Sequence, residues 1–161
     1  MKPAAACLFL TCLSAACVEI NGGAVEFSWV IRSRSGSAIT DCGCADPAIA
    51  KVRLVLTGVG APGSAIDGAT PCAPPAQCAF TCSRQTGATP FNIQETHGVE
   101  RYEVSVMAVG VDGNDLPQVM TPAPILREVV RGQPTELESM QLVADCATEC
   151  QMNSSGVCAR P

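Results

Sequence analysis

Residues 24–32 have the sequence Ala-Val-Glu-Phe-Ser-Trp-Val-Ile-Arg, and this stretch decides the fold class. Its apolar side chains fall on every second position, at Val25, Phe27, Trp29 and Ile31. Polar residues take most of the positions between them. A period of two places alternate side chains on opposite faces of an extended chain, so the stretch predicts a β-strand with one buried face.

Two further stretches repeat this alternation. The apolar positions are Val52, Leu54 and Leu56 in residues 51–57, and Tyr102, Val104, Val106 and Ala108 in residues 101–109. Weaker strands are expected at residues 78–84, 91–95, 125–131 and 135–143. The last of these also has apolar residues at a spacing of three, which would suit one or two helical turns. Glycine- and proline-rich turns separate the strands, and no helix of ten residues is expected.

Several short strands joined by turns predict an all-β fold, and specifically an antiparallel β-sandwich of about seven strands. The segment 25–29, with its tryptophan, resembles the second strand of immunoglobulin-like and fibronectin type III domains. The segment 102–108 resembles their penultimate strand, and Gly132-Gln133 before residues 135–143 is similar to the final strand of transthyretin-like modules. Together these resemblances cover residues 24–143 and imply an immunoglobulin-like fold, without specifying a function.

The amino terminus predicts an export signal. Lys2 supplies a positive charge, and residues 4–13 form a short apolar stretch. Such a stretch is too short to span about 30 Å of hydrocarbon as a helix, which favours a removable signal peptide. Residues 13–17, Leu-Ser-Ala-Ala-Cys, resemble the lipobox of bacterial lipoproteins, although the leucine lies one position further from the cysteine than is usual in that family. The resemblance implies cleavage before Cys17 and lipidation of this cysteine.

Other interpretations of this terminus stay open. The small residues before Cys17 also suit ordinary secretion without lipid, a retained buried segment is a further alternative, and cleavage before Cys12 fits less well. If Cys17 is lipidated, the membrane is the first partner, and the chain belongs to a bacterial cell envelope. Val18, rather than Asp, follows the cysteine and favours the outer membrane, with the domain facing the periplasm or the cell surface.

The composition predicts one small extracytoplasmic domain. Charged residues make up 16% of the 161 residues, whereas there are 14 Gly, 12 Pro and 11 Cys. The net charge of −5 offers no basic surface for phosphates, so nucleic acid is not an expected partner. The expected boundaries are a signal peptide at 1–16, a lipidated tether at 17–23, the β-sandwich domain at 24–143, and a cysteine-containing tail at 144–161.

Cysteines carry the strongest chemical signal after the leader. Eight remain once Cys17 is assigned to lipid: Cys42, Cys44, Cys72, Cys78, Cys82, Cys146, Cys150 and Cys158. An even number in an exported chain predicts four disulfides, although the spacings within 42–44 and 146–150 leave a zinc site as the alternative. Eight cysteines allow 105 pairings. We expect Cys42 or Cys44, and by proximity both, to pair with the group at 72–82. Because three is odd, at least one bridge must tie the tail to the body.

Residues suited to catalysis are few, and no catalytic residue, metal or cofactor is expected. His97 is the only histidine, and its setting is that of a solvated loop. Glu136 and Glu138 would share the solvated face of a strand, and their spacing does not establish a glycosidase pair. The sequence Asp-Gly-Asn-Asp at 112–115 predicts a hairpin turn, with weak calcium binding as the alternative.

These observations favour a non-catalytic cell-envelope lipoprotein whose disulfide-stabilised β-sandwich has a structural or binding role. Another envelope protein is a candidate partner, and any binding would use the loops at 32–46, 58–77 and 110–124. The alternatives are a small extracytoplasmic hydrolase and a carbohydrate-binding module. The second requires exposed aromatic platforms, whereas Trp29 and Tyr102 lie mid-strand and are expected in the core.

Overall fold

The computed structural model describes residues 22–62, 64, 68–72, 78–90, 93 and 99–161. Within these residues the fold is all-β, with short 3-10 turns in place of longer helices. In chain order the elements are β1 (Ala24–Arg32), β2 (Ala38–Ile39), η1 (Cys42–Cys44), β3 (Ala45–Asp46), β4 (Lys51–Gly58), β5 (Ala79–Thr81), η2 (Cys82–Arg84), β6 (Thr86–Ala88), β7 (Val99–Val109), β8 (Ile125–Val130), β9 (Pro134–Glu136), β10 (Met140–Val143), β11 (Asp145–Cys146), β12 (Gln151–Met152) and β13 (Val157–Ala159).

The first layer is built around β1, which has strands along both of its edges. One edge is shared by β9 and β10, and the other by β6 and β2. β6 and β9 pair with the first half of β1, whereas β2 and β10 pair with its second half. The sheet then continues from β2 through β13 to β12. One long strand therefore holds together several strands that are too short to be stable alone.

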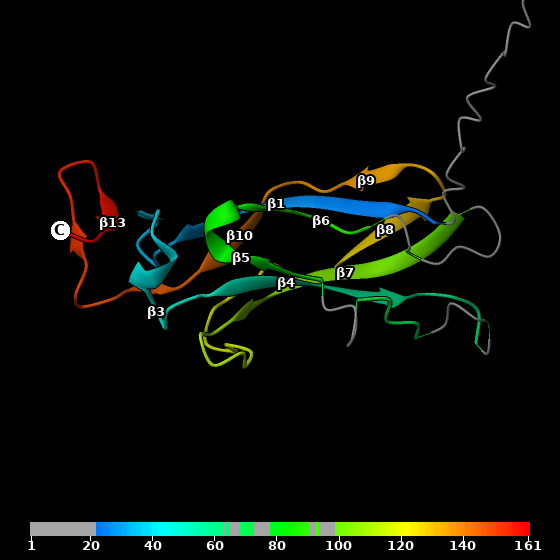
Figure 1. Cartoon of the computed structure of the whole chain (residues 1–161), viewed down its shortest axis with the longest axis horizontal. Helices are drawn as coiled ribbons and strands as arrows, with labels where there is room; N and C mark the ends of the chain where they lie inside the picture. Colours follow the sequence, from blue (N-terminus) through cyan, green and yellow to red (C-terminus); the bar gives the residue numbers. More distant parts are fainter. Residues whose placement is uncertain (1–21, 63, 65–67, 73–77, 91–92, 94–98) are drawn as a thin grey trace, which may run out of the picture.

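The second layer is a four-stranded antiparallel sheet in the order β5-β4-β7-β8. β4 pairs with β7 along its whole length, from Lys51 opposite Val109 to Gly58 opposite Tyr102. Figure 1 shows the two layers one above the other, with β1, β6 and β9 in one and β4, β5 and β7 in the other. The two clearest alternating stretches after β1 are therefore neighbours in one sheet.

The predicted antiparallel arrangement is wrong for the first layer. β1 runs parallel to both β9 and β10, and β13 runs parallel to β2. After β8 the chain turns at Gly132, whose φ is +70°, and crosses from the second layer to the first. β9 thus begins beside the start of β1 and runs in the same direction. Alternation marks a strand but not the direction of its neighbours, so this feature was outside the reach of the sequence pattern.

Two of the weaker strands are shorter than predicted. The strand expected at 78–84 is β5 and ends at Thr81, where η2 begins. The strand expected at 135–143 is divided into β9 and β10, and the helical alternative for it is wrong. The strand expected at 91–95 lies largely outside the described residues, although Ile93 forms a bridge with Gly23.

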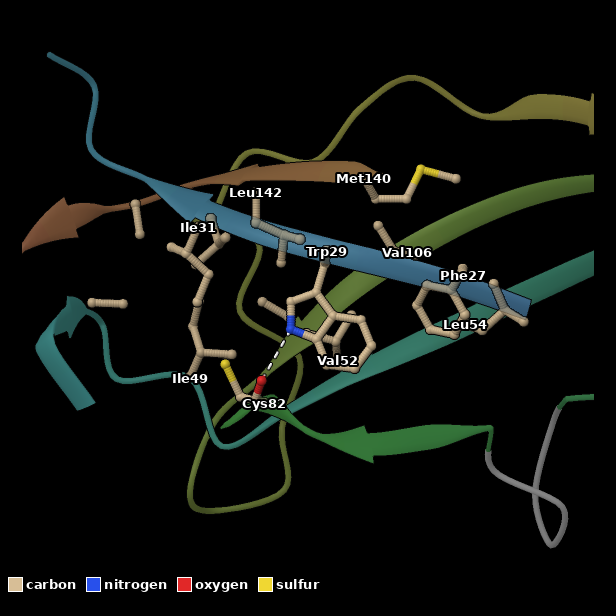
Figure 2. Packing of buried hydrophobic residues seen from close by; sticks show 14 of the residues in the cluster. Phe27, Trp29, Ile31, Ile49, Val52, Leu54, Cys82, Val106, Met140 and Leu142 are labelled. Carbon is tan, nitrogen blue, oxygen red and sulfur yellow. Dashed lines mark hydrogen bonds between the residues drawn. The ribbon is translucent and has the colours of Figure 1, made fainter. Parts of the chain in front are cut away.

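The core lies between the two layers. Trp29 and Tyr102 are buried, with exposed fractions of 1% and 0%, as the alternation predicts. Trp29 extends from β1 toward the second layer, where its indole Nε1 donates a hydrogen bond to the carbonyl oxygen of Cys82 at 3.1 Å (Figure 2). This bond satisfies the single polar atom of the ring, so the indole is buried without an unpaired donor.

β6 passes close to the core because its middle residue is glycine. A Cβ atom at Gly87 would lie 2.7 Å from ring atoms of both Phe27 and Phe80. These two rings meet edge to face, with centroids 5.5 Å apart. Any side chain at position 87 would therefore displace an aromatic contact. The same glycine removes the apolar alternation by which β6 could have been predicted.

The cysteine-containing tail at residues 144–161 is part of the folded domain. β13 pairs with β2, and β11 pairs with β3. Figure 1 places β3, β13 and the carboxyl terminus at the same end of the molecule, which is the end where β1 finishes. We call this end the far pole and define it as residues 33–46 and 144–161.

Candidate functional site

The far pole is separated from the start of β1 by the length of that strand. β1 has nine residues, which at about 3.3 Å each span roughly 30 Å. Gly23 lies at one end of the molecule, beside Ile93, and β2 begins at the other. A group attached before β1 and a partner bound at the far pole would therefore be held apart by the whole domain.

Disulfides concentrate at the far pole. Three bridges involve its residues, namely Cys42–Cys82, Cys44–Cys150 and Cys146–Cys158, and the fourth, Cys72–Cys78, closes a loop of the second layer. The first two span 40 and 106 residues of sequence, so they fasten the pole to the body and the tail to the pole. The eight cysteines that the sequence assigns to disulfides are therefore paired.

The predicted pairings are partly right. Cys42 does pair with the cysteine group at 72–82, through Cys82, and the tail is tied to the body through Cys44–Cys150. The expectation that Cys44 would also pair with that group is wrong. Cys42 and Cys44 occupy the first and last positions of η1, and in a 3-10 turn residues two apart point in different directions. One sulfur thus faces the core at Cys82, while the other faces the tail.

The η1 turn is fixed by polar contacts at the far pole. Asp41 precedes it, and its carboxylate Oδ1 accepts a hydrogen bond from the backbone N–H of Gly43 at 2.8 Å. The guanidinium of Arg160 packs over the same glycine, since a Cβ there would lie 2.7 Å from Arg160 Nη2. Arg160 Nε also forms a 3.4 Å ion pair with Asp41. The last residues of the chain thus cover the turn that orients Cys44.

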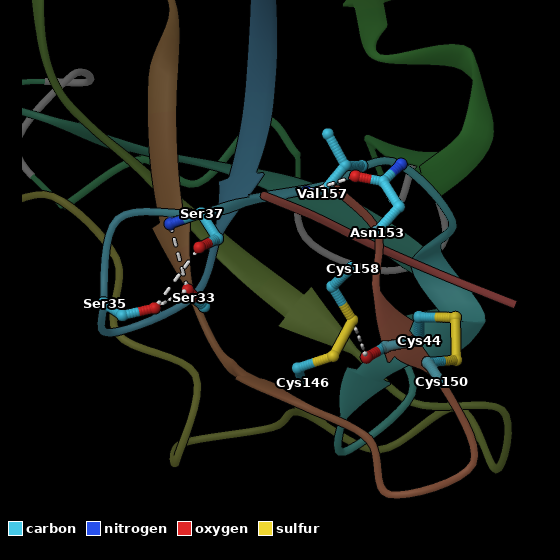
Figure 3. The surroundings of a disulfide bond; sticks show 9 residues. All are labelled: Ser33, Ser35, Ser37, Cys44, Cys146, Cys150, Asn153, Val157 and Cys158. Atoms are coloured by element: carbon cyan, nitrogen blue, oxygen red, sulfur yellow. Dashed lines mark hydrogen bonds between the residues drawn. A yellow bond between two sulfur atoms is a disulfide. The ribbon is translucent and has the colours of Figure 1, made fainter. Parts of the chain in front are cut away.

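A loop of serines at residues 33–37 lies at the far pole, with Ser35 exposed and Ser33 buried (Figure 3). Ser33 Oγ and Ser35 Oγ are 2.8 Å apart, and the backbone N–H of Ser37 donates to Ser33 Oγ at 3.1 Å. Arg34 in the same loop forms a 3.1 Å ion pair with Asp145. Both partners of that pair are more than half exposed, so the pair adds little to stability. The loop has an ordered shape through hydrogen bonds.

The tail continues this polar surface. Asn153 Oδ1 accepts hydrogen bonds from the backbone N–H groups of Ser155 and Val157, which closes the turn between β12 and β13. Met152 beside it is 48% exposed. An exposed methionine next to an exposed amide is suited to a small apolar contact with another macromolecule.

A hollow of about 360 Å³ lies on the outer face of the first layer. Its lining includes Glu26, Ser28, Arg84, Thr86, Glu136 and Leu137. The parallel pairing of β1 with β9 places Glu26 directly beside Glu136. The sequence predicted that Glu136 and Glu138 would share one face of a strand. This prediction is wrong, because β9 ends at Glu136 and Glu138 lies beyond it. No sequence signal could have indicated Glu26, because its position depends on the unpredicted parallel pairing.

Both carboxylates in the hollow are exposed, and like charges on neighbouring strands repel each other. Among the described residues there is no group of three side chains suited to a metal ion. Cys17 and His97 lie outside the described residues.

The expected turn at 112–115 is confirmed. The backbone N–H of Gly113 bonds to the carbonyl oxygen of Gly110, and Val109 forms a bridge with Asp115. Asp112 accepts hydrogen bonds from the backbone N–H and from the side-chain amide of Asn114, and these bonds lower the pKa of its carboxyl group. Asp115 is held by a 2.7 Å ion pair to Arg53 of β4, which attaches the turn to the second layer.

Comparison with known proteins gives no match: no protein-family model, curated protein or solved structure is similar to this chain. None of the helices among the described residues is long and apolar enough to cross a membrane.

Proposed function

We propose that the protein is a non-catalytic lipoprotein of the bacterial cell envelope, which presents a binding surface at its far pole. The observation that carries the proposal is the direction of β1, which starts directly after the expected tether at 17–23 and ends at the far pole. If Cys17 is lipidated, residues 17–23 have a reach of at most about 25 Å, so the start of β1 stays near the membrane. The far pole, roughly 30 Å along β1, can then lie farther from the membrane than the start of that strand.

The disulfides support a presenting role. Ser35, Met152 and Asn153 are exposed side chains of the far pole, and a binding surface there would benefit from a rigid support, because ordering a loop on binding costs free energy. Cys44–Cys150 and Cys146–Cys158 supply that support at the far pole, where the strands have only two or three residues. A surface already ordered before binding loses less entropy when a partner docks.

An immunoglobulin-like sandwich is the fold that we propose for the two layers. In antibody domains a buried tryptophan packs beside the disulfide that joins the two sheets. Here Trp29 of the first layer donates its hydrogen bond to Cys82, whose sulfur is bonded to Cys42. The carbohydrate-binding alternative has less support, because Trp29 and Tyr102 are buried and offer no stacking platform.

The test of the anchor compares two cysteines of the leader. Cys17→Ser removes the acceptor of the lipid but leaves the small residues at 14–16, so export continues while anchoring fails. We expect the mature protein to move from the membrane pellet to the soluble fraction. Cys12→Ser, the matched control, should leave it in the pellet. Membrane retention of the Cys17→Ser protein, together with an unmodified Cys17 in the parent by mass spectrometry, would overturn the lipoprotein proposal.

A further inference from the structure

The disulfide connectivity has an unusual order along the chain. Only Cys72–Cys78 joins cysteines that are neighbours in sequence. The bridge Cys44–Cys150 interleaves with Cys42–Cys82 at one end and with Cys146–Cys158 at the other. The native partner of Cys44 therefore lies in the tail, although three other cysteines, Cys72, Cys78 and Cys82, come first along the chain.

Loop entropy does not select the native partner for Cys82. The native bridge from Cys42 spans 40 residues, and the alternative from Cys44 is two residues shorter. The probability of loop closure varies as about the −3/2 power of loop length, so these two pairings differ by roughly 10% in an unfolded chain. The choice of Cys42 depends on η1 being folded, because only that turn directs the two sulfurs apart.

In the tail, loop entropy favours the wrong partner. Cys146–Cys158 spans 12 residues, whereas Cys150 lies four residues nearer to Cys158. The same scaling makes the non-native Cys150–Cys158 bridge about twice as probable before the tail folds. That bridge would also consume the sulfur that Cys44 requires.

Three of the four cysteines in the two tail bridges are buried, and Cys146 is half-buried. Cys44 and Cys158 have exposed fractions of 0%, and Cys158 Sγ lies 3.6 Å from the carbonyl oxygen of Cys44. Figure 3 shows the two bridges side by side. The docked tail therefore restricts the access of a thiol to most of these sulfurs, whereas an undocked, mispaired tail leaves them open to attack.

We infer that this protein is a substrate of a dithiol–disulfide isomerase during its maturation. The isomerase thiolate attacks one sulfur of a wrong bridge, such as Cys150–Cys158, and the other sulfur leaves as a thiolate. A cysteine thiolate of the chain then displaces the isomerase from the mixed disulfide. The number of disulfides in the chain is unchanged, the isomerase recovers its thiol, and no net oxidant is needed for this step. The inference takes an oxidising compartment from the proposed function.

The test uses protein purified from the producing cells, reduced in denaturant and then reoxidised with glutathione disulfide. One sample contains a catalytic amount of an isomerase with a Cys-x-x-Cys site, and the other does not. Trypsin and a Glu-specific protease cleave the products, and cleavage after Glu149 separates Cys146 from Cys150. The non-native tail bridge then appears as an internally linked peptide of residues 150–161, identified by tandem mass spectrometry.

Among the first tail bridges formed without isomerase, before the tail folds, we expect about two molecules with Cys150–Cys158 for each with Cys146–Cys158. With isomerase the native set should become the main product. Equal native yield and equal rate in both samples would overturn the inference. This result is independent of the lipid anchor, whose failure appears instead as an unmodified Cys17.

Two double variants test whether the isomerase acts on the bridges of the tail. Cys72→Ala with Cys78→Ala removes the local bridge and should leave the isomerase dependence unchanged. Cys146→Ala with Cys158→Ala removes the same number of cysteines but leaves Cys150 as the single thiol of the tail, so the gain in native Cys44–Cys150 from isomerase should fall. A larger effect of the first variant than of the second would contradict the assignment to the tail.

Discussion

The two layers around Trp29 and the far pole are stabilised in different ways. Between the layers, long strands bury apolar side chains, and Trp29, Leu54 and Leu56 are each at most 1% exposed. At the far pole, β2, β3, β11 and β12 have two residues each, and the buried apolar side chains are mainly alanines and cysteines beside Ile39. Disulfides add to these smaller apolar contacts, with three of the four bridges placed at that end.

This difference in stabilisation shows how one small domain can combine a hydrophobic core with short polar segments that are held rigid by disulfides. A hydrophobic core stabilises in proportion to the apolar area that it buries, which a two-residue strand cannot supply. A disulfide stabilises chiefly by restricting the unfolded chain, and this effect grows with the length of the loop that it closes. Polar surface residues can thus be held in place without being buried.

Removal of Cys44–Cys150 should have the largest effect. The bridge spans 106 residues, and its loss through Cys44→Ala with Cys150→Ala should lower the free energy of unfolding by about 4.7 kcal/mol. Cys72–Cys78 spans only 6 residues, and the matched double variant should lose about 2 kcal/mol. Urea unfolding followed by circular dichroism measures both. Equal losses would show that loop length does not govern stability at the far pole.

The core should respond to Trp29→Ala with a loss of about 3 to 5 kcal/mol, because a large cavity forms and the indole hydrogen bond to Cys82 disappears. Val30 is the matched control on the same strand, since its side chain points outward and is 39% exposed. Val30→Ala should change stability by no more than about 0.5 kcal/mol. If the two variants melted at similar temperatures, the assignment of the inner and outer faces of β1 would be wrong.

The strands of the core could be predicted because a strand with one buried face has apolar residues at every second position of its sequence. The pattern at residues 24–32, 51–57 and 101–109 reports which side chains face the core, and each stretch forms a strand. The parallel pairing of β1 with β9 left no such trace, because it depends on how the chain crosses between layers after Gly132.

The far pole was harder to predict because disulfides do not impose a period. The sequence indicated eight paired cysteines and a bridge from the tail to the body, but not that η1 would direct Cys44 toward the tail. The hollow with Glu26 and Glu136 was missed for a related reason. Both features arise from contacts between segments far apart in the chain, which residue spacing alone does not encode.

Gly87→Ala tests how closely β6 packs against the core, because we expect it to lower the stability of the protein, whereas a change from glycine to alanine in a strand usually raises it. In an open strand, replacing glycine by alanine stabilises by about 0.5 to 1 kcal/mol. Here the new Cβ would press on Phe27 and Phe80, so we expect a loss of about 1 to 3 kcal/mol. In a Phe80→Leu background the loss should be smaller, since one of the two rings is gone. A stabilised Gly87→Ala protein would show that β6 lies farther from the core.

The smallest effect is expected at the 112–115 turn, which belongs to neither region and is held by polar contacts alone. Hydrogen bonds from Asn114 lower the pKa of Asp112 in the folded protein. Because the folded protein holds the Asp112 carboxyl at a lowered pKa, the ionised carboxylate stabilises the folded state. This stabilisation is complete above the unfolded-state pKa of about 3.9, and it is lost as the pH falls through the lower pKa of the folded state. Asp112→Ala should therefore lower the Tm slightly at pH 7, and this difference from the parent should shrink as the pH falls below about 3.9. Val111→Ala, at the neighbouring position that is 85% exposed, should show no such pH dependence. Melting curves across this pH range would contradict the account if the difference between Asp112→Ala and the parent persisted in acid.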